Sequence, residues 1–328
     1  MQFQYFNDSL LQSCTCYLNL GPNDFSSQDF QSYLAHCGLH FKAAEEDILF
    51  SLNLVKKMAY KLLITNAGVL FFAKNPQAYY PEAFITAVKY QTNDRFSIID
   101  KKDFIGSPLS QIEASLAFVL RHMNVGVHID AAQGAARQEI YDYPPIAIRE
   151  AIINAVTHRD YLYDGSHIYI HMYPDYIDIE SPGGLYSGLT IEDLGRRSVR
   201  RNRLIADLLD RARYIERVGS GFDRMRDALL KNQNPALEVS ATNFFSIRFF
   251  KRTQDVNLEK LTPRQLAIYY SFFERKQLTK RDVVIGHHIS EDTAMRELKH
   301  LMQLGFIQKE GTGKATCYVL ISKDTHTK

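Results

Sequence analysis

The chain has 328 residues, of which 45% are hydrophobic and 23% charged, and its formal net charge is only +2. This length suits two or three domains with buried cores, and the composition is typical of a soluble globular protein. The small net charge excludes a protein-wide attraction to nucleic acid, so any basic surface must be local.

Targeting signals and metal-binding cysteine pairs are both missing from the sequence pattern. No stretch approaches 18 consecutive apolar residues, and the N-terminus lacks a basic segment followed by an apolar one. The four cysteines fit a reducing compartment, and Cys14 and Cys16 have no second pair with metal-ligand spacing. We therefore expect a soluble, cytoplasmic protein with no membrane partner.

The first part of the chain mixes predicted helices and strands behind a loose or strand-forming lead-in over residues 1–24. Capping residues and apolar periodicity locate these elements. The helices are expected at residues 26–37, 43–52, 54–73 and 109–123, and the strands at residues 83–91, 95–99 and 138–143. The mixture predicts an N-terminal α/β segment over residues 1–125.

A helix that starts at Pro144 and Pro145 opens the central part of the chain. Proline suits the first helical turn, where the N–H group it lacks would have no partner anyway. Ile148, Ile152 and Val156 then recur at helical spacing. They predict one buried stripe along this helix.

Three polar residues line a neighbouring face of the same helix. Glu150, Asn154 and His158 stand at i, i+4 and i+8. A carboxylate, an amide and an imidazole in register can hold a hydrated divalent cation and activate a water molecule. A solvated helix face is the alternative interpretation of this spacing.

Two short strands and two glycine-rich turns follow this helix. The strands are expected at residues 167–173 and 176–180, joined by a turn at Pro174. Ser181-Pro-Gly-Gly-Leu185 is the first glycine-rich turn, and Gly219-Ser-Gly221 opens another helix. Because such turns can present backbone N–H groups to phosphate, the layout favours a nucleotide site.

The ordered motifs resemble the GHKL ATPase-like module of RecG-like and Schlafen/AlbA-type transcriptional regulators. The motifs that carry the resemblance are Arg149–Tyr161, Ser181–Leu185, Arg201-Asn202 and Glu216–Gly221, with Leu63–Pro76 upstream. The resemblance spans roughly residues 25–250 and implies an α/β sandwich that binds ATP and Mg²⁺. Helicase activity is not supported, since the chain has no G-x-x-x-x-G-K-[ST] loop. The look-alikes carry an AlbA-type domain that this chain is expected to lack, being naturally short or trimmed, so no nuclease activity is assigned.

The resemblance implies roles for individual residues. Glu150 would orient the attacking water, and Asn154 would hold the magnesium ion. The other residues implied at the nucleotide site are His158, Ser181, Gly183, Gly184, Arg201, Asn202, Gly219, Ser220 and Gly221. The family usually presents D-x-G-x-G, whereas this chain has serine at position 181 and leucine at position 185. A hydroxyl accepts hydrogen bonds more weakly than a carboxylate, which lowers the expected adenine selectivity and, still more, the expected hydrolysis.

Residues 195–226 form the most charge-biased segment, with ten arginines against four acidic residues. Guanidinium groups match phosphate geometry. Three interpretations are open: a lid over a nucleoside triphosphate, a contact with a DNA backbone, or a salt-bridged helix surface. Ser198, Arg201 and Asn202 match the family's lid segment, which favours the first.

The C-terminal part follows a polar linker over residues 252–260. Three helices, beginning near Thr262, Leu278 and Ser290, precede a predicted hairpin over residues 306–321, which is a winged-helix layout. The side chains expected to contact DNA are Thr293, Arg296, Lys299, Lys309 and Lys314. Residues 251–328 hold 14 Lys/Arg and 9 Asp/Glu, which suits phosphate contacts. A structural or dimerising role is the alternative.

The sequence thus predicts an α+β fold: a GHKL-type domain over residues 126–251 and a winged helix-turn-helix domain over residues 261–328. We expect an ATP- and Mg²⁺-binding transcriptional regulator that binds double-stranded DNA as a homodimer, and weak ATPase activity is left open. One alternative is an active ATPase in DNA maintenance or phage defence. The other is a degenerate dimerisation scaffold that binds DNA but no nucleotide.

Overall fold

The structure is a computed structural model of the whole chain, and it describes most of its residues. The described residues are 17–18, 24–39, 43–58, 61–129, 137–186, 188–215, 221–252, 261–275, 277–311, 313 and 316–321. Gly219, Ser220 and Lys314 lie outside this set, and so does most of the predicted linker. Within the described part, no helix is long and apolar enough to cross a membrane.

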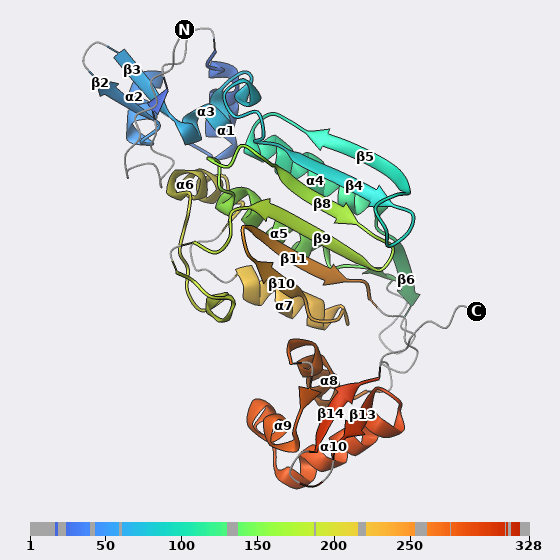
Figure 1. Ribbon diagram of the computed structural model, residues 1–328. Coiled ribbons are helices and arrows are strands. Elements are labelled where there is room, and N and C mark those ends of the chain that lie inside the picture. The colour runs from blue at the N-terminus through green and yellow to red at the C-terminus, as the bar shows by residue number, and fades with distance from the viewer. Residues whose placement is uncertain are drawn as a thin grey trace.

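A six-stranded mixed sheet forms the centre of the protein (Figure 1). In order across the sheet its strands are β10 (Glu238–Ala241), β11 (Phe244–Phe250), β9 (Tyr176–Pro182), β8 (Ile168–Met172), β4 (Ile85–Tyr90) and β5 (Ile98–Phe104). The β4–β8 pair is parallel and the other pairs are antiparallel. The sheet takes strands from both sides of the predicted boundary at residues 125/126, so the fold is continuous across it.

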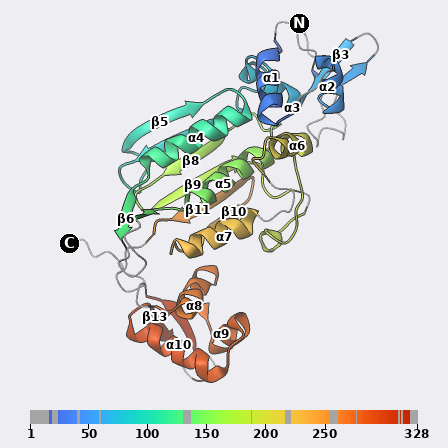
Figure 2. The same cartoon turned by 180° about the vertical axis from the view of Figure 1, so that it is seen from behind.

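Three helices cover one face of this sheet (Figures 1 and 2): α4 (Pro108–His122), α5 (Pro145–His158) and α7 (Gly221–Lys231). The predicted start of α5 at its two prolines is confirmed, and Ile148, Ile152 and Val156 are buried as the periodicity predicts. Their burial against the sheet fixes which way the rest of α5 faces. Glu150, Asn154 and His158 lie on a neighbouring face of α5 and line one pocket.

Smaller elements pack at one end of the sheet. They are β1 (Tyr17–Leu18), α1 (Ser27–His36), α2 (Glu45–Ser51), β2 (Val55–Met58), β3 (Lys61–Thr65), α3 (Asn66–Phe72) and η1 (Pro76–Ala78). The Ser26 side chain caps α1, and the Tyr33 hydroxyl donates to the Leu208 carbonyl of α6 (Arg203–Arg211) at 2.9 Å. A separate hairpin joins β6 (Val125–Ile129) to β7 (Arg137–Tyr141).

The predicted helix over residues 54–73 is wrong. Residues 55–58 and 61–65 form the antiparallel strands β2 and β3, and only residues 66–72 are helical. The Thr65 side chain accepts a hydrogen bond from Gly68 N at 3.1 Å, so it caps α3 and prevents the helix from extending upstream. The periodic apolar run therefore contains both a strand and a helix, which share one core.

The strand predicted at residues 95–99 starts later than expected and runs longer. The Asp94 carboxylate accepts a hydrogen bond from Phe96 N at 3.0 Å, which closes a turn over the residues expected to open the strand. The strand β5 therefore begins at Ile98 and ends at Phe104. It forms one edge of the six-stranded sheet.

The C-terminal unit has its own hydrophobic core (Figure 1). Its elements are α8 (Pro263–Glu274), β12 (Gln277–Leu278), α9 (Lys280–His287), α10 (Glu291–Gln303), β13 (Ile307–Glu310) and β14 (Cys317–Leu320), and the strands pair in the order β12-β14-β13. Side chains of Thr262, Thr279 and Ser290 cap the three helices, at or next to the positions that the sequence indicates.

Candidate functional site

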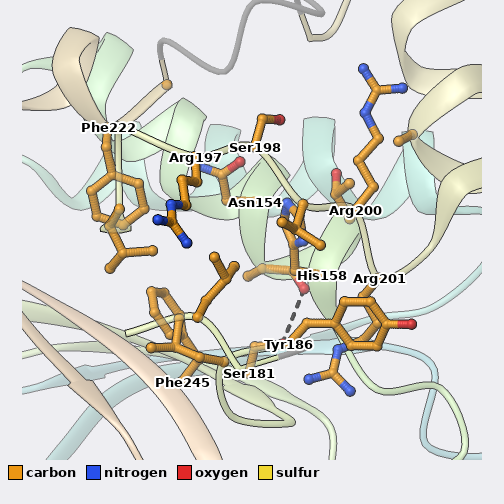
Figure 3. A pocket seen from close by; sticks show the side chains of 18 of the residues that line it. Asn154, His158, Ser181, Tyr186, Arg197, Ser198, Arg200, Arg201, Phe222 and Phe245 are labelled. Atoms are coloured by element: carbon orange, nitrogen blue, oxygen red, sulfur yellow. Dashed lines mark hydrogen bonds between the residues drawn. The ribbon is translucent and has the colours of Figure 1, made fainter. Parts of the chain in front are cut away.

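A pocket opens where α5, the end of β9 and the start of α7 meet (Figure 3). Residues between 185 and 201 on either side of η2 (Ile191–Asp193) also line the pocket. The pocket and its open mouth together enclose about 1120 Å³ free of protein atoms.

The structure brings most of the residues predicted for the nucleotide site into this one pocket. The predicted residues that line it are Glu150, Asn154, His158, Ser181, Gly183, Gly184, Arg201 and Gly221. Asn202 does not line it, because its buried amide donates to the Thr157 and Arg159 carbonyls at 2.9 and 2.7 Å. Asn202 therefore holds the end of α5 in place, next to the pocket.

Glu150 lines the pocket and is 5% exposed. Its Oε2 accepts a hydrogen bond from Arg224 Nη2 of α7 at 3.1 Å. Its Oε1 sits directly against Gly221, where an added Cβ would collide with it. Glycine at position 221 thus lets the start of α7 approach a carboxylate that a larger residue would displace.

Asn154 and His158 line the same pocket as Glu150 (Figure 3). Among the described residues, none forms a hydrogen bond with either side chain, so their polar atoms are available to a ligand. Burial, and then the positive charges of Arg201 and Arg200, lower the pKa of His158 to about 4. The imidazole is therefore neutral near pH 7 and can accept a hydrogen bond.

The turn after β9 packs tightly against its surroundings. Ser181 Oγ donates to the Ala155 carbonyl of α5 at 3.0 Å, the hydrogen bond drawn in Figure 3. Gly183 has φ +97°, and a Cβ on Gly184 would collide with the Thr242 carbonyl oxygen. Both glycines are therefore required by the backbone itself. The Ser181 hydroxyl already donates its hydrogen bond to α5, so toward the pocket it can only accept hydrogen bonds.

Four arginines surround the pocket, and each has an acidic partner. The pairs are Arg197–Asp193 (3.2 Å), Arg200–Asp207 (3.3 Å), Arg201–Asp160 (3.3 Å) and Arg224–Glu150 (3.1 Å). In Figure 3, Arg197 points into the space beside Asn154, whereas Arg200 extends away from it. The arginines that line the pocket are therefore salt-bridged, and their role as a lid over a nucleoside triphosphate stays a prediction.

The apolar walls of the pocket were missed by the sequence analysis. Tyr186, Phe222 and Phe245 contribute aromatic rings, and the Arg201 guanidinium lies 5.1 Å from the Tyr186 ring centre. Phe245 is opposite Ser181 in the β9–β11 register, which brings it beside the turn. The position of Phe245 follows only from the pairing of two strands that are far apart in the sequence. Phe222 could have been suspected from the sequence, because it directly follows Gly221.

Metal-ligand clusters do not stand out around this pocket. Within the described ranges, no group of three or more His, Cys, Asp or Glu side chains is arranged to hold a metal ion. Asn154 nevertheless offers an oxygen atom of the kind that magnesium prefers, while the Glu150 carboxylate is engaged by Arg224 at 3.1 Å. Mg²⁺ usually keeps several waters and takes its remaining ligands from one or two side chains and from substrate phosphates, so this donor set fits such an ion.

The residues predicted to contact DNA lie in the C-terminal unit. Arg296 and Lys299 are exposed on α10, Thr293 is half-buried in its first turn, and Lys309 is exposed on β13. Two acidic residues, Glu291 and Asp292, share that first turn. The Lys280 ammonium pairs with Glu291 at 2.5 Å, which offsets part of this negative charge.

Comparisons with known proteins agree with an ATPase-like central fold. Residues 165–249 match the family HATPase_c_4, described as "Putative ATP-dependent DNA helicase recG C-terminal". None of the curated proteins matches the chain. The crystal structure of the DIP2311 protein from Corynebacterium diphtheriae is similar, with a TM-score of 0.62 and 18% identity over 94% of this chain. This chain covers 64% of that one, and at this identity the similarity shows the fold alone.

Proposed function

We propose that this chain is a nucleotide-responsive regulator that binds ATP with Mg²⁺ in the central pocket and DNA through its C-terminal unit. The observation that carries the nucleotide site is the meeting of Asn154, neutral His158 and four arginines in a single pocket with aromatic walls. Guanidinium groups suit a phosphate chain, and aromatic rings suit a base. The match of residues 165–249 to an ATPase-like family supports the same ligand class.

Magnesium would be held by Asn154 Oδ1 together with water and the phosphate oxygens of the nucleotide. When bound, the ion would neutralise phosphate charge that the paired arginines leave uncompensated. Glu150 is engaged by Arg224 at 3.1 Å, so its carboxylate is already committed to an ion pair. This engagement favours nucleotide binding over rapid hydrolysis, and it is the reason we propose a regulator in preference to a turnover ATPase.

Titration calorimetry with ATP and magnesium tests the nucleotide site. Wild-type protein is expected to bind saturably, and Asn154→Ala is expected to bind at least tenfold more weakly, a loss of about 1.4 kcal/mol or more. Asn93→Ala is a matched control, because Asn93 is exposed and lies outside the pocket. Absence of any wild-type binding would overturn the proposal and leave the DNA-binding scaffold as the better interpretation.

The C-terminal unit is proposed to be a winged helix that binds double-stranded DNA. Its three helices and the β13–β14 hairpin follow the order of that domain, with α10 as the recognition helix. Arg296 and Lys299 project from the exposed side of α10, and Lys309 from the hairpin. These cations suit contacts with backbone phosphates, which supply most of the affinity for DNA.

Anisotropy of a labelled DNA duplex tests this domain and its coupling to the pocket. The double variant Arg296→Ala/Lys299→Ala is expected to weaken binding and to lower the salt slope by about 0.9 for each phosphate that the protein no longer neutralises. Lys231→Ala, at an exposed residue of α7, is expected to leave both the DNA affinity and its salt slope unchanged. Saturating ATP and magnesium should shift the wild-type DNA affinity at least threefold; an affinity that is the same at every nucleotide concentration would contradict the coupling.

A further inference from the structure

The strand β5 leaves one edge of the central sheet open. It pairs with β4 on one side, and no described strand pairs with its other side (Figure 1). Every second residue of an edge strand directs its N–H and C=O groups outward, where they can pair with another strand. This edge is therefore available for the addition of a strand.

Exposed apolar side chains concentrate along this edge. Phe96 is 93% exposed, Ile99 59% and Ile105 66%, and Ile98 is exposed as well. Monomeric proteins usually protect an edge with proline, a bulge or charges over most of its length. Four of the seven residues of β5 are charged, so a partner strand must match these charges as well as the exposed isoleucines on either side of them.

The sequence of β5 is complementary to itself in one antiparallel register. When a two-fold axis perpendicular to the sheet relates two antiparallel copies of one strand, the two residues of each cross-strand pair point to the same face of the sheet. Because side chains alternate between the faces along the strand, the residue numbers of such a pair differ by an even number and therefore add to an even number. With Lys102 opposite Lys102 of the second copy, Lys101 faces Asp103 and Ile99 faces Ile105, each pair occurring twice.

The opposite face of the strand tolerates the same register. The two Lys102 side chains meet at the axis, but each can reach diagonally to Asp100 of the second copy. Lys102 extends over the Phe104 ring, with Nζ 5.7 Å from its centre, so its charge lies on the face of the strand that Asp100 shares. Lys101 and Asp103 thus align, as do the isoleucines, whereas Asp100 faces Phe104. The one like-charge pair lies diagonal to Asp100, which pairs with His122 of its own chain at 3.1 Å.

We propose that β5 pairs with β5 of a second copy of this chain about Lys102, which joins two six-stranded sheets into one continuous sheet. The two-fold axis keeps the covering helices of both copies on the same side of that sheet. Each cross-strand pair contributes roughly 0.2–1 kcal/mol beyond the backbone hydrogen bonds. The proposal is independent of the nucleotide site, because no residue of β5 lines the pocket.

Cysteine cross-linking of the full chain tests the register. In Lys102→Cys, the two introduced residues would face each other with Cα atoms roughly 4.5–5.5 Å apart, inside the range that a disulfide spans. Mild oxidation is expected to give a covalent dimer rapidly with this variant. Lys101→Cys and Asp103→Cys should cross-link far more slowly, and wild-type protein measures the background from the native cysteines. Faster cross-linking at position 101 or 103 would overturn the register.

Sedimentation velocity over a range of concentrations tests the interface without cross-linking. Wild-type protein is expected to show a monomer–dimer equilibrium, and Ile99→Asp is expected to weaken it at least tenfold by placing a carboxylate against Ile105 of the second copy. Ile285→Asp is the matched control, because Ile285 is 61% exposed on α9 and lies outside β5. A wild-type monomer at every concentration, or a dimer that Ile99→Asp leaves unchanged, would overturn the proposal.

Discussion

The free energy of unfolding is expected to fall by about 2–4 kcal/mol between pH 7 and pH 5, because two histidines resist protonation in the folded protein. Burial lowers the pKa of His158 and of His171 to about 4. The positive charges of Arg201 and Arg200 add to this effect at His158, and Arg95 adds to it at His171. Both residues belong to the central α/β part of the protein.

The sign of the effect follows from which state binds the proton. Above about pH 7.5, both imidazoles are neutral whether the chain is folded or unfolded, so they do not make stability depend on pH. Below that pH the unfolded chain takes up protons that the folded chain does not, and stability declines until about pH 4. At His171, the negative charge of Asp178 opposes the lowering of the pKa without cancelling it. The Tyr90 hydroxyl lies 3.0 Å from Nδ1 of the same imidazole.

Urea unfolding followed by circular dichroism at a series of pH values measures this dependence. His158→Gln and His171→Gln are each expected to remove about half of the decline between pH 7 and pH 5. Carboxylates with lowered pKa values, such as Asp193 and Asp282, lose their stabilising effect only below this range. They therefore do not contribute to the change in stability between pH 7 and pH 5. A double variant that keeps the wild-type profile would show that neither histidine is the cause.

Substitution of Arg159 is expected to produce the largest loss of stability from a single side chain, about 3–5 kcal/mol. Arg159 is 1% exposed, and its Nη2 donates to the carbonyls of Glu82, Tyr163 and Ser166 at 2.9, 3.3 and 2.8 Å. In Arg159→Met these three acceptors lose their shared donor while the apolar volume is kept. Burial also lowers the pKa of Arg159, which shows how costly this environment is for a charge.

Thermal and urea unfolding of three variants separate the causes. Arg159→Lys keeps the charge, but its compact ammonium group cannot reproduce the planar fork, so most of the loss should remain. Arg203→Met is the control, since that side chain is 85% exposed, and it should change stability by less than about 0.5 kcal/mol. An Arg159→Met variant as stable as wild type would refute the role of this arginine in holding residues 159–166 against the sheet.

Local sequence signals predicted much of the secondary structure. Pro145 at the first turn of α5 and Ser107, Thr262 and Ser290 at other helix starts are recognisable because capping depends on residues close in sequence. The same kind of signal misled at residues 54–73. There an apolar run that suits a helix is split by the Thr65 cap, and its first part finds a strand partner.

The candidate site was predictable only where it follows one helix or one turn. Glu150, Asn154 and His158 share a face of α5 by helical geometry, and the glycine turns are visible as motifs. The Glu150–Arg224 pair and the position of Phe245 beside Ser181 were not predictable, because each joins elements distant in sequence. Their partners depend on which helix packs on which strand.

The sequence by itself determined the amphipathic helices, their caps and the order of chemical groups along α5, since all of these arise from neighbours within a few residues. Only the tertiary structure decided that four arginines surround one pocket and that each pairs with an acid. It also placed β5 at the edge of the sheet, where its isoleucines are exposed. Charge pairing and edge exposure are properties of segments brought together by long-range packing, which periodicity along the chain does not encode.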